Sequence, residues 1–355
     1  MAYTSIDDPA QYFNTVLYTG NGSTQSITGV GFQPDWVWNK NRSSARNHYA
    51  TDSVRGAQKT LRQNSTDGES TQSGGVTAFN SDGFSVGSDN VVNESGDSLV
   101  AWNWLAGGSA SSNSDGSITT SVSVNTTAGF SIVSYTGTGS TGTVGHGLGV
   151  TPQMIIIKKR DTDGTDWITF GSVLGGTVGS EFIKLNQANA KTTGLDTSWF
   201  NQTAPTSSVF TVGTQSDLNG SSATYIAYCF AEKKGYSKFG SYTGNGSTDG
   251  TFVYTGFRVG WFMVKRTSGT DQWIMYDNKR ETFNTMDNTL VADGTDAEFS
   301  NSAYNTIDFL SNGFKCRGGT SGSGTGTNES GGSYIYMAFA ESPFVNSNGV
   351  PTNAR

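Results

Sequence analysis

The chain has 355 residues, of which 14% are charged and 47 are glycine, and its formal net charge is −7. A negative charge with only scattered basic residues argues against nucleic-acid binding, and no run of 18 apolar residues suggests a membrane-spanning helix. Gly, Ser, Thr and Asn favour short strands and tight turns over helices, so the composition predicts an all-β protein.

Three motifs recur in the same order and predict three tandem copies of one domain. The first motif is a Tyr-Thr-Gly triplet, the second is a strand that runs from a Gly to a Lys nine positions later, and the third is an aromatic strand that closes the copy. The copies of the three motifs lie at 18–20, 31–40 and 100–105, then at 135–137, 149–158 and 226–231, and finally at 242–244, 256–265 and 335–340.

The repeats set the expected boundaries. We expect an N-terminal arm at 1–16, three domains at 17–108, 131–235 and 236–344, a Ser/Thr/Asn/Gly-rich linker at 109–130, and a tail at 345–355. About seven or eight short strands with Gly, Asn and Asp turns in each copy predict β-sandwiches, either immunoglobulin-like or small jelly rolls. One short helix is expected within 43–61.

The recurring aromatic positions are interpreted as core. The positions of Trp36, Trp38, Trp102 and Trp104 hold Met, Ile, Tyr, Phe or Trp in the other copies, so hydrophobic volume is what these positions supply. Trp199, in the variable part of copy two, and Tyr304, at the like place in copy three, are the aromatics predicted to contact a ligand.

The lysines that end the recurring strands are expected to be edge charges that pair with a carboxylate or prevent edge-to-edge aggregation. They are Lys40, Lys158 and Lys265. Cys229 and Cys316 are expected to be free buried thiols.

Catalytic chemistry has weak support in this sequence. His48 and His146 are expected at the surface or in turns, with no serine motif around them. The acidic stretch 161–166 is interpreted as a hairpin turn, and whether it binds calcium stays open because its twelfth position is Ser172 rather than Glu. No carboxylate pair is singled out for glycoside hydrolysis. We therefore expect no enzyme activity, no cofactor and no metal site.

The N-terminal part carries a family resemblance. The opening residues 1–9, the stretch 18–22, the strand 31–38 and the motif 101–104 resemble virion proteins of marine tailed phages. The resemblance implies a structural virion protein, in the tail or on the capsid surface, and brings no catalytic or binding residues with it.

The resemblance and the composition together lead to a functional expectation. We expect a tail fibre or tail-associated component that binds other virion proteins and host surface glycan, as a homo-oligomer with a trimer favoured. Ile6, Pro9, Tyr12 and Phe13 of the arm are the predicted docking residues. A capsid decoration or assembly protein is the main alternative, and a polysaccharide-degrading tail enzyme is the least favoured one.

Overall fold

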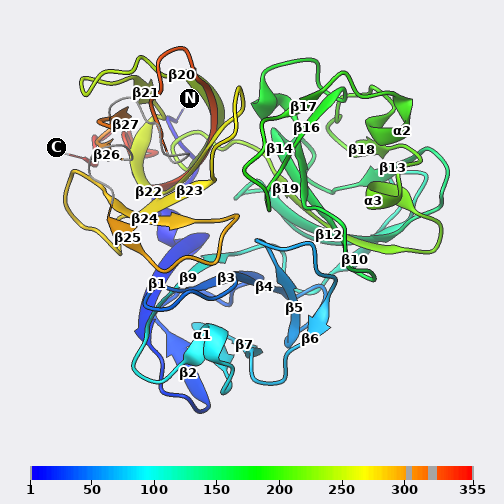
Figure 1. Cartoon of the computed structure of the whole chain (residues 1–355), viewed down its shortest axis with the longest axis horizontal. Helices are drawn as coiled ribbons and strands as arrows, with labels where there is room; N and C mark the ends of the chain where they lie inside the picture. The colour runs from blue at the N-terminus through cyan, green and yellow to red at the C-terminus, as the bar shows by residue number, and fades with distance from the viewer. Residues whose placement is uncertain (1, 301–305, 319–325, 354–355) are drawn as a thin grey trace.

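The structure is a computed structural model that describes residues 2–300, 306–318 and 326–353. Antiparallel strands pair into sheets that come as a larger and a smaller sheet in three successive parts of the chain, here called units 1, 2 and 3. Units 1, 2 and 3 contain β1–β9, β10–β19 and β20–β28, and they surround a common centre (Figure 1). The predicted all-β class with β-sandwich packing is confirmed.

Unit 1 has a six-stranded sheet in the order β1-β9-β3-β4-β5-β6 and a three-stranded sheet in the order β2-β8-β7. A short 3-10 helix, η1 (Pro9–Gln11), precedes it, and α1 (Asn90–Asn93) lies between β8 and β9. The strands are β1 (Phe13–Thr19), β2 (Gln25–Thr28), β3 (Trp36–Asn41), β4 (Tyr49–Asp52), β5 (Lys59–Arg62), β6 (Ser70–Thr71), β7 (Val76–Asn80), β8 (Gly83–Val86) and β9 (Ser98–Trp104).

Unit 2 has an eight-stranded sheet in the order β10-β11-β12-β19-β14-β15-β16-β17 and a two-stranded sheet, β13-β18. Its short helices are η2 (Ser172–Leu174), α2 (Thr197–Phe200) and α3 (Ser216–Asn219). The strands are β10 (Ser111–Asn113), β11 (Thr120–Asn125), β12 (Phe130–Thr136), β13 (Gly142–Gly145), β14 (Met154–Lys159), β15 (Ile168–Phe170), β16 (Glu181–Lys184), β17 (Thr192–Thr193), β18 (Val209–Val212) and β19 (Thr224–Phe230).

Unit 3 repeats the arrangement of unit 1, with the sheets β20-β28-β22-β23-β24-β25 and β21-β27-β26. The strands are β20 (Ser237–Thr243), β21 (Phe252–Tyr254), β22 (Phe257–Arg266), β23 (Ile274–Asp277), β24 (Asn288–Val291), β25 (Phe299–Ser300), β26 (Ile307–Leu310), β27 (Gly313–Cys316) and β28 (Ser333–Pro343).

Two sequence-based expectations about local structure are corrected here. The segment 109–130, expected to be a linker, instead contributes β10 and β11, and β11 pairs with β12 in the larger sheet of unit 2. The segment 43–61 holds β4 and the start of β5 rather than a helix. In each segment one strand pairs on both sides, β11 with β10 and β12 and β4 with β3 and β5. These ladders satisfy the backbone groups that a loop would leave to water.

Each larger sheet is buried on both faces. In unit 1, Val37 and Ala101 face the smaller sheet and pack with Ile27 and Phe84. The opposite face carries Trp36, Trp38, Trp102 and Trp104, which point to the common centre. The tryptophans are therefore core residues, as expected, but the core they form lies between the units.

The central core joins side chains from all three units. The ring of Trp36 stacks on Tyr228 of unit 2 with centroids 4.4 Å apart, and Trp104 meets Trp261 of unit 3 edge to face at 5.6 Å. Each fully buried aromatic side chain stabilises the fold by about 1.5–3 kcal/mol. The three units thus share one hydrophobic core and depend on one another for its completion.

Candidate functional site

The repeated lysines bind across the junctions between units. Their side chains are fully buried, because β3, β14 and β22 lie inside the larger sheets rather than at an edge. The expectation of edge charges is therefore wrong. Desolvation lowers the pKa of each lysine to about 8. The Nζ atoms donate to carbonyls of a neighbouring unit, namely Lys40 to Thr295 at 3.1 Å, Lys158 to Thr66 at 3.3 Å and Lys265 to Ala188 at 2.9 Å.

A ring nitrogen follows the same pattern at each junction. Trp167 and Trp273 donate their indole N–H groups, each at 2.8 Å, to the backbone carbonyls of Arg62 and Lys184 in the neighbouring unit. His48 takes the corresponding position in unit 1, with Nε2 3.0 Å from the carbonyl of Val291.

The environment of His48 fixes its tautomer. Nδ1 accepts a hydrogen bond of 2.8 Å from the indole of Trp38, so Nε2 carries the proton. Complete burial lowers the pKa of His48 well below its ordinary value. His146 is also buried, with Nε2 bonded to the carbonyl of Thr206. Neither histidine is at the surface, although both lie in connecting segments between strands, so only the expectation of surface exposure is corrected.

The junction between units 1 and 2 holds a cluster of ion pairs. Arg55, whose side chain is fully buried, lies 2.5 Å from Asp52 and 3.2 Å from Glu69. Unit 2 adds Arg160, which pairs with Glu69 at 2.9 Å, and Tyr228, whose hydroxyl donates to Asp52 at 2.7 Å.

The junction between units 3 and 1 holds the same cluster in corresponding residues. Arg280 pairs with Asp277 at 2.6 Å and with Glu298 at 2.7 Å. Unit 1 adds Arg42, 2.6 Å from Glu298, and Trp102, whose indole donates to Asp277 at 3.0 Å. The charges compensate one another within each cluster, as buried ions require.

The junction between units 2 and 3 has none of these pairs. Gly171 and Leu174 stand where the other units have the Asp and the Arg, and Lys191 stands in place of the Glu. In unit 3, Thr267 stands at the position of Arg42 and Arg160. Met337 stands at the position of Trp102 and Tyr228, which donate to the Asp in the other two junctions. Gly171 has a φ of +132°, and a Cβ there would lie 2.3 Å from a backbone oxygen, so an Asp cannot replace it without a backbone shift. The backbone contact is retained, because Lys191 N donates to Thr267 O at 3.1 Å as Glu69 N does to Arg160 O at 2.6 Å.

A groove of about 410 Å³ opens at this third junction. Its single charged lining residue is Lys191, whose Nζ lies 2.8 Å from Oε2 of Glu181 and 3.0 Å from the carbonyl of Leu174. The other lining residues are small, hydroxylated or apolar, and they come from the end of η2, β20, the end of β22 and the start of β28: Gly175, Ser241, Tyr242, Thr243, Thr267, Ser268, Ser333, Tyr334 and Ile335.

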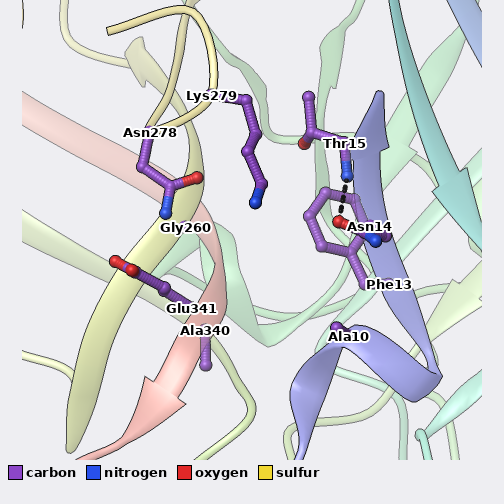
Figure 2. Close-up of a pocket in the computed structure, with 9 residues that line it drawn as sticks. All are labelled: Ala10, Phe13, Asn14, Thr15, Gly260, Asn278, Lys279, Ala340 and Glu341. Atoms are coloured by element: carbon purple, nitrogen blue, oxygen red, sulfur yellow. Dashed lines mark hydrogen bonds between the residues drawn. The ribbon is translucent and has the colours of Figure 1, made fainter. Parts of the chain in front are cut away.

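A second, smaller pocket of about 60 Å³ lies between β1 and unit 3. Figure 2 shows Asn278, Lys279 and Glu341 of unit 3 around this space, opposite Asn14 and Thr15 of β1. Its volume holds a few water molecules at most. A further pocket of about 190 Å³ lies within unit 2, beside Glu181 and Thr193. The groove between units 2 and 3 exceeds both in volume and is therefore the candidate site for a small molecule.

The predicted ligand-contact residues lie elsewhere. Trp199 is half-buried in α2, and its ring packs on Phe182 with centroids 4.4 Å apart, so much of it serves packing within unit 2. Tyr304 lies outside the described residues. Trp199 does not line the groove.

The predicted docking residues are packed within this chain. Ile6, Pro9 and Phe13 are buried and Tyr12 is half-buried, and Phe13 stacks on Phe339 of unit 3 with centroids 4.9 Å apart. The arm therefore belongs to the fold, because its apolar side chains complete the junction between units 1 and 3. The buried side chains of Ile6, Pro9 and Phe13 are not free to dock on another protein, which corrects that expectation for them, whereas Tyr12 keeps an exposed part.

The acidic stretch 161–166 forms turn and junction contacts. Asp161 accepts from the backbone of Thr224, Asp163 accepts from Gly68 of unit 1, and Asp166 pairs with Lys184 at 2.7 Å. In the ranges that the structure describes, no three His, Cys, Asp or Glu side chains are placed to hold one metal ion.

Two further properties follow from the described ranges. Cys229 and Cys316 are free and buried, as expected, and burial raises the pKa of each thiol to about 12. Among the described helices, none has both the length and the apolar character needed to cross a bilayer.

Comparison with known proteins gives one family. Residues 8–343 match a family described as a domain of unknown function (DUF7483). The matched residues run from before η1 to the end of β28, so they include all three units. No curated protein matches the chain.

Proposed function

The chain belongs to the DUF7483 family, and we propose that it is a structural protein of a tailed-phage virion that attaches the particle to the host surface. The proposed place is the tail, as a fibre or tail-associated component. The motifs at 1–9, 18–22, 31–38 and 101–104, which resemble marine phage virion proteins, support this role.

One structural observation carries the proposal further. The three units surround one centre and exchange the same lysine, ring-nitrogen and backbone contacts, so the chain has approximate threefold symmetry. Phage fibres are usually trimers, and a threefold arrangement within one chain can stack on a threefold partner. The low-charge surface of Ser, Thr, Asn and Gly suits contact with hydroxylated glycans.

The closed arrangement of the three units bears on where in the tail the chain fits. Three units around one centre make a compact body instead of an extended rod, so the chain fits the tip of a tail structure better than its shaft. A homotrimer of the chain, as first expected, would carry nine such units, and mass photometry of the purified protein distinguishes it from a monomer.

Immunogold electron microscopy of particles whose genome encodes this chain tests the proposal. Gold at the tail tip supports it. Gold on the head would favour the capsid decoration role instead, and particles without gold would refute a virion role. Binding of the purified protein to intact host cells tests attachment separately.

A further inference from the structure

The groove between units 2 and 3 interrupts the approximate symmetry at one place. Arg55 and Glu69 occupy the corresponding space between units 1 and 2, whereas Leu174 and Lys191 leave it open between units 2 and 3. The opening of about 410 Å³ lies at the junction that lacks these ion pairs, and its volume falls within the usual range of small-molecule sites.

The walls of the groove present hydroxyl groups without partners. Ser241, Thr243 and Ser333 are exposed, and within the described part of the chain their hydroxyls make no hydrogen bond. Each hydroxyl can donate one hydrogen bond and accept two. A ligand that itself carries several hydroxyls matches this lining.

The charge of the groove is compensated. Lys191 already donates to Glu181 and to the carbonyl of Leu174, so an anion would have to compete with a buried carboxylate. The lining of the groove exposes apolar as well as polar surface, while the side chains of Leu174, Tyr334 and Ile335 lie buried beneath it. Hydroxyls beside an apolar surface suit a sugar ring, which has polar edges and an apolar C–H face.

We infer that the groove between units 2 and 3 is a binding site for an uncharged saccharide. The inference rests on the proposed role in host attachment, for which a cell-surface glycan is the expected ligand. It places the ligand at the junction of two units rather than at Trp199.

Isothermal titration of the full chain with neutral trisaccharides tests this assignment. The probes are maltotriose, mannotriose and chitotriose, with sialyllactose and a sulfated disaccharide as charged comparators. We expect at least one neutral probe to bind and to bind more tightly than either charged comparator. No binding by any neutral probe, or a preference for the charged ones, would overturn the assignment.

Variants locate the binding in the groove. Ser241→Trp fills the opening from an exposed position of β20, and we expect it to weaken binding at least about tenfold. Leu17→Trp is the matched control, because exposed Leu17 has the corresponding place in β1, and it should bind as the wild type does. If Ser241→Trp fails to fold, Ser333→Gln, at the exposed start of β28, replaces it. Unchanged binding by the folded variant would refute the site.

Cell binding separates this inference from the proposed function. If folded Ser241→Trp attaches to host cells as well as the wild type, the attachment role stands and the groove assignment fails. If the wild-type protein binds a neutral saccharide but does not bind host cells and is not found on phage particles, the groove assignment stands and the proposed function fails.

Discussion

The substitution Asp277→Asn removes one charge from the cluster between units 3 and 1. Oδ2 of Asp277 accepts from Nε of Arg280 at 2.6 Å and from the indole of Trp102 at 3.0 Å, while Oδ1 accepts from the backbone of Lys279 and Arg280. An Asn side chain has only one oxygen, so in either orientation its NH₂ group faces two N–H donors. The variant therefore loses two hydrogen bonds and one ion pair together.

The size of the loss follows from burial. The side chains of Asp277 and Arg280 are at most 1% exposed, and breaking a buried ion pair costs about 3–5 kcal/mol. Arg280 keeps Glu298 at 2.7 Å, so we expect the lower end, about 3 kcal/mol. The matched control is Asp249→Asn, because Asp249 pairs with Lys315 while its side chain is 81% exposed. Exposed pairs contribute less than about 1 kcal/mol.

Urea denaturation followed by tryptophan fluorescence measures both variants, with the free energy of unfolding taken by linear extrapolation. We expect Asp277→Asn to lower the midpoint markedly and Asp249→Asn to leave it nearly unchanged. If the two variants lose the same free energy, the cluster between the units is not what stabilises this junction, and the reasoning from burial fails.

Three other predictions concern buried groups, and urea unfolding serves each of them, as the measurement or as the trigger. The free energy of unfolding should rise between pH 7.5 and 9, because the folded pKa of Lys158, about 8, lies below its ordinary 10.5 and the unfolded state binds more protons in that window; Lys158→Met should reduce the rise by about 1 kcal/mol, and an unchanged rise would contradict the burial. Cys229 should stay unreactive to Ellman's reagent at pH 8 until urea unfolds the chain, since burial raises its thiol pKa; rapid reaction of the native protein would show access that the structure lacks. Deletion of residues 2–8 should cost about 2 kcal/mol through loss of buried Ile6, whereas a free docking arm could be removed at no cost.

The sequence contained enough to predict the strands of the repeated motifs. The expected strand at 31–40 corresponds to β3, and the closing aromatic strands correspond to β9, β19 and β28. These strands carry apolar side chains on both faces, and that pattern predicts burial of both faces. The pattern does not tell which sheet or unit packs on each face. The core that the three units share around Trp36 and Trp104 was therefore not predictable from one copy.

The segment 109–130 was predicted as a linker for a compositional reason. β11 has only Val122 and Val124 as apolar residues, and the Ser and Thr around them are typical of flexible segments too. Pairing with β12, which follows after the short turn 126–129, decides its structure, and the Ser- and Thr-rich composition of β11 did not reveal this hairpin.

The sequence carried one sign that the junction between units 2 and 3 differs from the other two. Arg42 and Arg160 follow their repeated lysines by two positions, but Arg266 follows Lys265 by only one, and the true counterpart is Thr267. A strict register would have shown that unit 3 lacks this arginine. The absence of the matching Glu, replaced by Lys191 in unit 2, becomes visible only once the structure shows which unit meets which.

The contact between Lys40 and Thr295 spans 255 residues of the chain. A ribosome adds roughly 5–20 residues per second, so Lys40 leaves the ribosome about 10–50 s before its partner is made. During this interval Trp102 and Trp104 have no unit 3 to cover them. The nascent chain therefore exposes an aromatic surface whose partner in the same chain is made last. If unit 3 of a neighbouring chain packs on this surface first, the two chains become intertwined instead of each closing on itself.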